Sequence, residues 1–195
     1  AAEPSARGAG REPDPRAPQT RATQRRAAEQ PGATSSAPRA ATKTPKLPLS
    51  DSERDALRAA GLSARELAVT EPLELARRTQ RAIPRARCTE LVALARFQQL
   101  GSVGLETARD FVALGFECVD DLRGHDAKEL YARMCELTRS RQDPCVEDAF
   151  RCAIAQAEHP DLPARWREWF RWTSLRGEPP GTLPPELRRL TDPRA

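Results

Sequence analysis

Apolar residues recur three and four positions apart through the middle of the chain, the spacing that gathers them on one face of a helix. Two runs show the pattern most clearly: Cys88, Leu91, Val92, Ala95 and Phe97 in the first, and Val146, Ala149, Phe150, Ala153, Ile154 and Ala157 in the second. No segment shows the alternation of apolar and polar residues that is typical of a half-buried strand. The pattern predicts an all-α fold.

Helix start signals divide this region into separate helices. Two serine–glutamate pairs have the spacing of capping boxes, in which the paired side chains satisfy free backbone N–H groups; they are Ser50 with Glu53, and Ser63 with Glu66. Prolines mark further starts, because proline has no N–H to leave unpaired; these are Pro72, Pro84 and Pro144. We also expect helices over about 105–114 and 126–137, and a closing helix that carries Trp166, Trp169 and Trp172.

The two ends of the chain lack this pattern. Residues 1–46 contain no Leu, Ile, Val or Phe, so they bury too little apolar surface to offset the entropy of ordering. They carry nine Lys and Arg against four Asp and Glu, whereas residues 47–195 carry 23 against 24. We therefore expect a disordered basic tail over 1–46, and a flexible segment over 177–195, where Gly and Pro return.

The helical region contains an internal repeat. Residues 57–62 align with residues 111–116, and each stretch has glycine as its fifth residue. After a one-residue slip, Leu67 aligns with Leu122, and Glu71 with Asp126. Each copy reads as a helix, a glycine stop, a short turn, an acidic cap and a further helix. We predict two units, over 47–97 and 98–176, the second ending in the aromatic helix.

The second unit opens with a short segment between two predicted helices, Gly101-Ser102-Val103-Gly104. Its glycines would permit a tight turn, and Val103 would fill the gap between the helices. The backbone N–H groups of the following helix would point outward and form a site for phosphate. Such a hairpin holds DNA without reading its sequence, because phosphate contacts carry no base information. The other interpretation is a turn that only packs the domain.

A run of arginines precedes this hairpin and faces one acid, Glu90; the run comprises Arg77, Arg78, Arg81, Arg85, Arg87 and Arg96. Because the net charge of +4 lies in the tail, a local patch of this kind would have to provide any affinity of the helical domain for nucleic acid. The run could flank the hairpin and add phosphate contacts. Equally, it could be a solvated helix surface.

Several short motifs occur together over about 80 residues: the hairpin, Gly115-Phe116, Leu130-Tyr131 and Asp143-Pro144-Cys145. In this combination they resemble the bacterial pathogenicity-locus family of small helix-hairpin-helix proteins, often labelled mitomycin-resistance proteins. The resemblance implies a tandem helix-hairpin-helix (SAM-like) fold and DNA-related work, with no established activity. The first unit, 47–97, looks like an added N-terminal half.

The sequence predicts no catalytic site, metal site or cofactor. Cys135, Cys145 and Cys152, with His125, lack the close cysteine pairs of structural zinc sites. A thiol nucleophile would need a nearby histidine, and only two histidines exist. Five unpaired cysteines without an apolar export or membrane segment lead us to expect a cytoplasmic protein with no membrane contact and no small-molecule substrate.

We therefore expect a non-enzymatic protein that binds the DNA backbone through Gly101–Gly104 and the arginine run. The alternative is a protein–protein adaptor of the same fold, whose hairpins serve only as a scaffold. A salt-sensitive interaction with DNA would favour the first. A defined protein partner without DNA affinity would favour the second.

Overall fold

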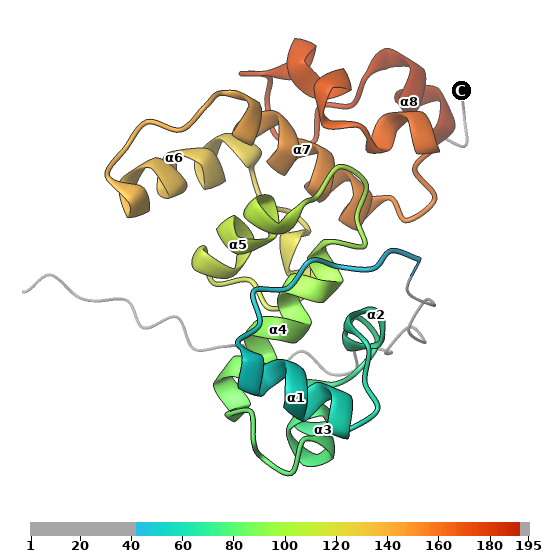
Figure 1. Cartoon of the computed structure of the whole chain (residues 1–195). Helices are drawn as coiled ribbons and strands as arrows, with labels where there is room; N and C mark the ends of the chain where they lie inside the picture. Colours follow the sequence, from blue (N-terminus) through green and yellow to red (C-terminus); the bar gives the residue numbers. More distant parts are fainter. Residues whose placement is uncertain (1–41, 192–195) are drawn as a thin grey trace, which may run out of the picture. The chain divides into compact units, whose positions relative to one another are not determined.

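The computed structural model describes residues 42–191 (Figure 1). Its elements are α1 (Asp51–Ala59), α2 (Ala64–Leu67), α3 (Pro72–Arg78), α4 (Arg85–Phe97), α5 (Leu105–Ala113), the 3-10 helix η1 (Val119–Leu122), α6 (Ala127–Thr138), α7 (Cys145–Glu158), the 3-10 helices η2 (Ala164–Arg167) and η3 (Trp169–Leu175), and α8 (Pro185–Thr191). No strand occurs among these residues, and the predicted all-α fold is confirmed.

The helices begin where the sequence places its start signals. Ser50 and Ser63 each form a complete capping box with the glutamate three residues later. Pro72 is the first residue of α3, and Pro84 directly precedes α4. At the start of α7, the Asp143 carboxylate accepts the N–H of Cys145 at 2.8 Å. Side-chain caps and prolines therefore mark these helix starts, as the sequence predicts.

The predicted repeat is present in the backbone geometry. Gly61 follows α1 and Gly115 follows α5, and both have positive φ, 61° and 94°, which glycine adopts without strain. In each copy the next residue donates its N–H to the carbonyl five residues earlier: Leu62 to Leu57 at 2.9 Å, and Phe116 to Phe111 at 3.0 Å. The same glycine turn therefore occurs twice.

The correspondence continues beyond the turns. Leu67 in α2 and Leu122 in η1 are both fully buried, one residue out of step as predicted. Glu71 stands immediately before α3, and Asp126 before α6. The order of elements in α1–α4 thus recurs in α5–α7, with η1 in place of α2. The identification of these units as helix-hairpin-helix domains stays a prediction.

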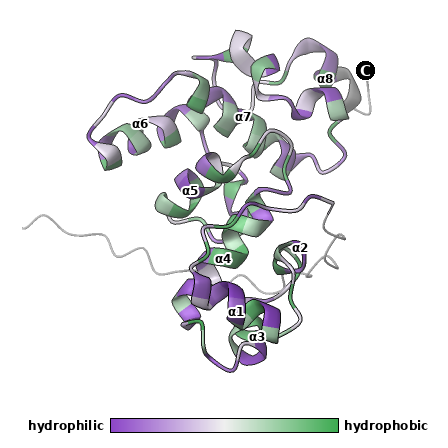
Figure 2. Cartoon of the chain, in the orientation of Figure 1, coloured by the Kyte–Doolittle hydropathy of each residue, from purple (hydrophilic) through white to green (hydrophobic). Residues whose placement is uncertain are grey.

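Helix α4 is shared by two hydrophobic clusters. With α1–α3 it buries Leu75 and Leu91, and its C-terminal end packs with α5–α7. There Phe111 lies between Phe97 and Phe150, at ring-centroid distances of 5.1 and 5.0 Å. In Figure 2, α4 is coloured mostly hydrophobic and α1 mostly hydrophilic, as expected for a central and a peripheral helix.

The aromatic segment forms η2 and η3 instead of the single closing helix expected. Trp166 and Trp172 are buried against α7, and the indole N–H of Trp172 donates to the Trp166 carbonyl at 2.9 Å. Glu168 is extended and separates the two 3-10 helices. Trp169, directly after this break, does not join the buried pair and stays 37% exposed.

Parts of the two predicted terminal segments belong to the fold. Residues 42–46 lie against the C-terminal end of α4, where the side chains of Gln98 and Gln99 hydrogen-bond to their backbone. Residues 185–191 form α8, and Leu187 is buried in a cluster with Trp172. Composition averages over a segment, so it misses single contacts of this kind. Residues 1–41 and 192–195, the rest of the predicted tail and the chain's last residues, lie outside the described part.

Candidate nucleic-acid interface

The hairpin between α4 and α5 contains the four residues that the sequence singles out, 101–104. Val103 is buried and packs in the core cluster of α4–α7, as predicted. The residue with positive φ in this turn is Ser102, at 59°, and neither Gly101 nor Gly104 has a positive φ. The expectation that the glycines make the tight turn possible through their conformational freedom is therefore wrong.

Gly101 is required by packing instead. A Cβ at this position would lie 2.3 Å from the Cβ of Arg167 in η2. The Gly101 N–H donates to the side-chain oxygen of Gln156 at 2.6 Å, and its carbonyl accepts from the same side chain at 3.0 Å. Both polar backbone groups of Gly101 are therefore occupied inside the protein, and its N–H cannot serve a phosphate.

The start of α5 is open. Gly104 precedes the helix in an extended conformation and offers no side chain to cap it. The first helical hydrogen bond runs from the Ala108 N–H to the Gly104 carbonyl, at 3.0 Å. The N–H groups of residues 105–107 donate to no acceptor among the described residues. Three backbone donors at the positive end of a helix dipole therefore face outward.

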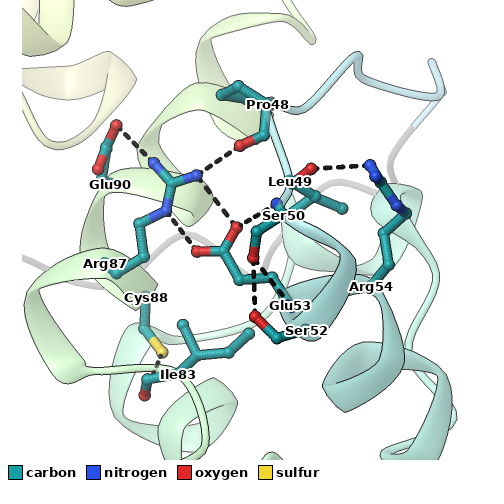
Figure 3. A network of polar contacts seen from close by, with 10 residues as sticks. All are labelled: Pro48, Leu49, Ser50, Ser52, Glu53, Arg54, Ile83, Arg87, Cys88 and Glu90. Atoms are coloured by element: carbon teal, nitrogen blue, oxygen red, sulfur yellow. Dashed lines mark hydrogen bonds and ion pairs between the residues drawn. The ribbon is translucent and has the colours of Figure 1, made fainter.

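The equivalent helix start in the first unit is closed (Figure 3). In the register of the repeat, Ser50 takes the position of Gly104. Glu53 takes the position of Thr107. The Ser50 hydroxyl accepts the Glu53 N–H at 3.2 Å, and the Glu53 carboxylate accepts the Ser50 N–H at 2.8 Å. The first unit thus places its own carboxylate on the helix start that the second unit leaves open.

Arg87 of α4 completes this closure. Its guanidinium binds the Glu53 carboxylate at 2.7 Å, Glu90 at 2.8 Å and the Pro48 carbonyl at 2.5 Å (Figure 3). The hydrogen bond from Arg87 is the largest cause that lowers the pKa of the Glu53 carboxyl below its usual value. The same bond is the largest cause that raises the pKa of Arg87. Arg87 therefore fastens residues 48–53 to α4.

Three cations that the sequence analysis did not select lie around the open hairpin: Lys43, Lys46 and Arg167. Lys43 and Lys46 line a groove together with Gly104 at the start of α5. The Lys43 ammonium donates to the Leu100 carbonyl at 2.5 Å. Burial, and secondly the charge of Arg167, lowers the pKa of Lys43, so the two cations are close enough to repel each other.

None of these three cations forms an ion pair with a residue of the described part. The Arg167 guanidinium donates to the Leu162 carbonyl at 2.8 Å and to the Pro160 carbonyl at 3.0 Å. Unpaired cations beside open N–H groups attract an anion such as a phosphate group. One acid opposes them, because Glu106 also lines the groove, but it pairs with Arg109 at 2.8 Å. Sequence reasoning missed the lysines because it assigned them to the tail, although Lys46 directly precedes the first apolar residue, Leu47.

The structure divides the predicted arginine run. Four members bind groups of the fold: Arg77 binds Glu74, Arg78 the Ala60 carbonyl, Arg87 Glu53 and Glu90, and Arg96 Glu71. Arg81 and Arg85 are exposed and form no ion pair within the described part. They lie at the N-terminal end of α4, about 18 Å along the helix from the hairpin at 1.5 Å per residue. The two arginines of the run that form no ion pair within the described part therefore lie at the opposite end of α4 from the hairpin.

The cysteines lie in different parts of the fold. Cys88 and Cys152 are buried, and the other three are half-buried. Burial raises the pKa of the Cys152 thiol to about 12, which keeps it protonated at neutral pH. Within residues 42–191, no three His, Cys, Asp or Glu side chains are grouped closely enough to hold a metal ion. In the same residues, no helix is both long and apolar enough to cross a membrane.

The helices, the repeat and the open start of α5 together define an all-α protein with a repeated helical unit and an open hairpin. The sequence profile of the pathogenicity locus family (Cdd1) matches residues 90–178. A protein named mitomycin resistance protein McrB, from Streptomyces lavendulae, is 40% identical over 77 residues, which is 40% of this chain and 70% of that protein. The chain belongs to the pathogenicity locus family, and the resemblance seen in the sequence is confirmed.

The matched stretch contains the hairpin, α5–α7 and the aromatic segment. It begins after most of the arginine run and does not include the first capping boxes. No solved structure gives a significant match to the chain. The family is named after a pathogenicity locus, and the relative is named after resistance to mitomycin. Neither name states a catalysed reaction.

Proposed function

We propose that this protein is a non-enzymatic protein that binds the phosphate backbone of DNA independently of base sequence. The observation that carries the proposal is the open start of α5 with Lys43 and Lys46 beside it, neither of which forms an ion pair within residues 42–191. A phosphate would accept hydrogen bonds from the free N–H groups and would neutralise the positive helix end. Backbone contacts of this kind are blind to sequence.

The first unit supports this assignment from within the same chain. At its equivalent helix start, the Glu53 carboxylate accepts a backbone N–H and binds Arg87. A helix start with this geometry therefore accommodates an anionic group together with a cation. In the second unit the cations are Lys43, Lys46 and Arg167, and the anion would come from the ligand. The first unit then acts as scaffold, because its own side chains occupy its site.

The predicted site residues take separate roles in this proposal. Gly104 leaves room for the phosphate, and the backbone of 105–107 donates to it. Val103 is buried beneath the turn, and Ser102 has the positive φ that the turn needs. Gly101 allows the turn to pack closely against η2. Arg81 and Arg85 lie too far along α4 to contact the same phosphate. The other four arginines of the run bind groups within the protein and stabilise its fold.

Two substitutions at Gly104 test the proposal. A Cβ at this position meets no atom within 4 Å, so both Gly104→Asp and Gly104→Ser fit, and both cap α5. Only aspartate adds a negative charge. We expect Gly104→Asp to weaken binding of the full chain to a short duplex about tenfold, or about 1.4 kcal/mol. Gly104→Ser should weaken it much less. Fluorescence anisotropy at several salt concentrations measures both.

The basic residues outside the described part need their own control, since they carry charge too. A synthetic peptide of residues 1–41 gives their affinity alone, and the wild-type chain must bind more tightly than this peptide. Equal affinity of peptide and chain, or equal binding by the aspartate and serine variants, would refute the hairpin site. The adaptor interpretation would then remain, with exposed Leu73 and Leu137 as the first apolar contacts to test.

A further inference from the structure

Two aromatic side chains are exposed side by side on η3. Trp169 is 37% exposed and Phe170 is 53% exposed, in a chain with only 5% aromatic residues. Their ring centroids lie 6.1 Å apart at an interplanar angle of 86°, so Phe170 packs edge-on and supports the indole. The neighbouring Trp166 and Trp172 are buried and already close the core over α7. Closing the core therefore does not explain Trp169.

Trp169 is attached to the hairpin. Its backbone N–H donates to the Ser102 hydroxyl at 3.3 Å. Two residues earlier in the chain, Arg167 packs on Gly101 so closely that a Cβ there would collide with it. The start of η3 is therefore fixed against the turn that leads into the open end of α5. An aromatic surface and a candidate phosphate site lie next to each other.

The charges around this aromatic surface indicate what it binds. The guanidinium of Arg171 lies 5.6 Å from the centroid of the Phe170 ring and pairs with Glu168 at 2.9 Å. Arg167 and Lys43 stand at the hairpin without an acidic partner in the described part, and both donate to backbone carbonyls there. An aromatic ring flanked by cations suits a ligand that offers a flat ring and a phosphate together, and a nucleotide does so. A purely apolar partner would leave Lys43 and Arg167 with backbone carbonyls as their only acceptors in the described part.

We infer that Trp169 stacks on an unpaired base while the hairpin holds the adjoining phosphate backbone. Bases inside a duplex are already stacked on their neighbours and offer no free face, so this contact requires unpaired nucleotides. The preferred ligand is then DNA in which a duplex adjoins a single-stranded gap. This inference rests on the proposed backbone binding and adds the class of DNA that the same site selects.

The test compares one duplex with the same duplex carrying a short central gap. The full chain and three variants are titrated by anisotropy: Trp169→Ala, Trp169→Phe and Leu137→Ala. Leu137 is 56% exposed on α6 and serves as an apolar control away from the hairpin. We expect wild type to bind the gapped DNA about tenfold more tightly than the duplex. Trp169→Ala should lose this preference and retain duplex affinity.

A second readout distinguishes stacking from loss of fold. A fluorescent adenine analogue, 2-aminopurine, placed in the gap should be quenched by wild type and by Trp169→Phe, which keeps a ring, and not by Trp169→Ala. Thermal melting of each variant is recorded alongside. Equal weakening of both DNAs by Trp169→Ala with a lowered melting temperature would make the indole structural and overturn the inference.

The two hypotheses fail in different ways. Equal affinity of wild type for gapped and intact duplex, with Gly104→Asp still weakening both, would overturn base stacking and leave backbone binding in place. No affinity for either DNA would refute the proposed function, and the inference with it. A protein partner lost by Trp169→Ala, without any DNA binding, would assign the aromatic surface to protein recognition instead.

Discussion

Single residues decide whether each copy of the repeat has a free helix start. Ser50 and Glu53 close α1 with their side chains, while Gly104 and Thr107 leave α5 without a cap. The sequence predicts the closure of α1, because the spacing of serine and glutamate identifies a capping box. It does not predict the role of Gly101, since a glycine needed for close packing and one needed for a turn look the same in a sequence.

Substituting Gly101 separates these two roles. Gly101→Ala places a Cβ 2.3 Å from Arg167 Cβ and 2.6 Å from its carbonyl, and backbone must shift to relieve the collision. We expect a loss of about 1–3 kcal/mol in the free energy of unfolding, the usual cost of overpacking. Gly104→Ser, where the Cβ has open space, is the control and should be neutral or slightly stabilising. Urea denaturation measures both, and equal midpoints would contradict the packing role.

Glu53 links stability to pH. Its pKa is lowered in the folded protein, chiefly by the hydrogen bond from Arg87, so its contribution is complete above the unfolded pKa. That contribution is lost as the pH falls from about 5 through the lowered folded value. Glu53→Gln should cost about 1.5–3 kcal/mol at neutral pH, as expected for hydrogen bonds to charged groups.

Urea denaturation at pH 7 and pH 3 compares the free energy of unfolding of wild type with that of Glu53→Gln. The gap between wild type and Glu53→Gln should narrow toward pH 3, because the wild-type carboxyl is then becoming neutral as well. Asp51→Asn, on the same helix and in a largely exposed pair with Arg54, is the control and should leave stability almost unchanged. A constant gap at both pH values would mean that Glu53 acts through shape and not through charge.

At the scale of elements, the regular helices follow from the sequence and the 3-10 segments do not. The stripe containing Phe150 and Ile154 predicts one buried face of α7, and that face is buried. The opposite face, with Asp148 and Cys152, is buried too, under η2, η3 and α8. Those segments are short, and two of them are 3-10 helices, so they are too brief to show a periodicity that predicts a covering layer.

The burial of Asp148 shows most clearly the effect of the layer that η2, η3 and α8 form over α7. Its carboxylate is fully buried and binds the guanidinium of Arg176 and, at 3.0 Å, the hydroxyl of Thr173, both from the region of η3. Asp148→Asn leaves the arginine without its charge partner in a partly buried site. We expect a loss of about 3 kcal/mol in the free energy of unfolding, near the lower end for a broken buried pair.

The matched control is the exposed pair of Glu168 and Arg171, also on the aromatic segment. Both side chains are more than two-fifths exposed, so Glu168→Gln should cost well under about 1 kcal/mol. Chemical denaturation compares the two variants, and tryptophan fluorescence reports whether η3 is released from α7. Similar costs for both substitutions would contradict the view that Asp148 anchors the layer.

At the scale of the whole molecule, α4 joins two units that have the same order of elements and different helix starts. The repeat and both glycine turns could be read from the sequence, because they rest on local backbone signals. The candidate site could be read only in part. Its hairpin is a local motif, but Lys43 and Arg167 reach it from positions 58 residues before and 66 residues after Gly101, through tertiary contacts that leave no local pattern.

The distance along α4 yields the last prediction, on the salt dependence of DNA binding. Each cation that neutralises a phosphate steepens the plot of log affinity against log salt by about 0.9 for duplex DNA. Lys46 lines the groove at the start of α5, so Lys46→Gln should reduce the slope by about one. Arg81 and Arg85 lie about 18 Å away along the helix, so Arg81→Gln with Arg85→Gln should leave the slope unchanged. Anisotropy titrations over a salt series give the slopes. A loss of about two from the double variant would instead place the arginines in the interface, and the duplex would then have to run along α4 from one end to the other.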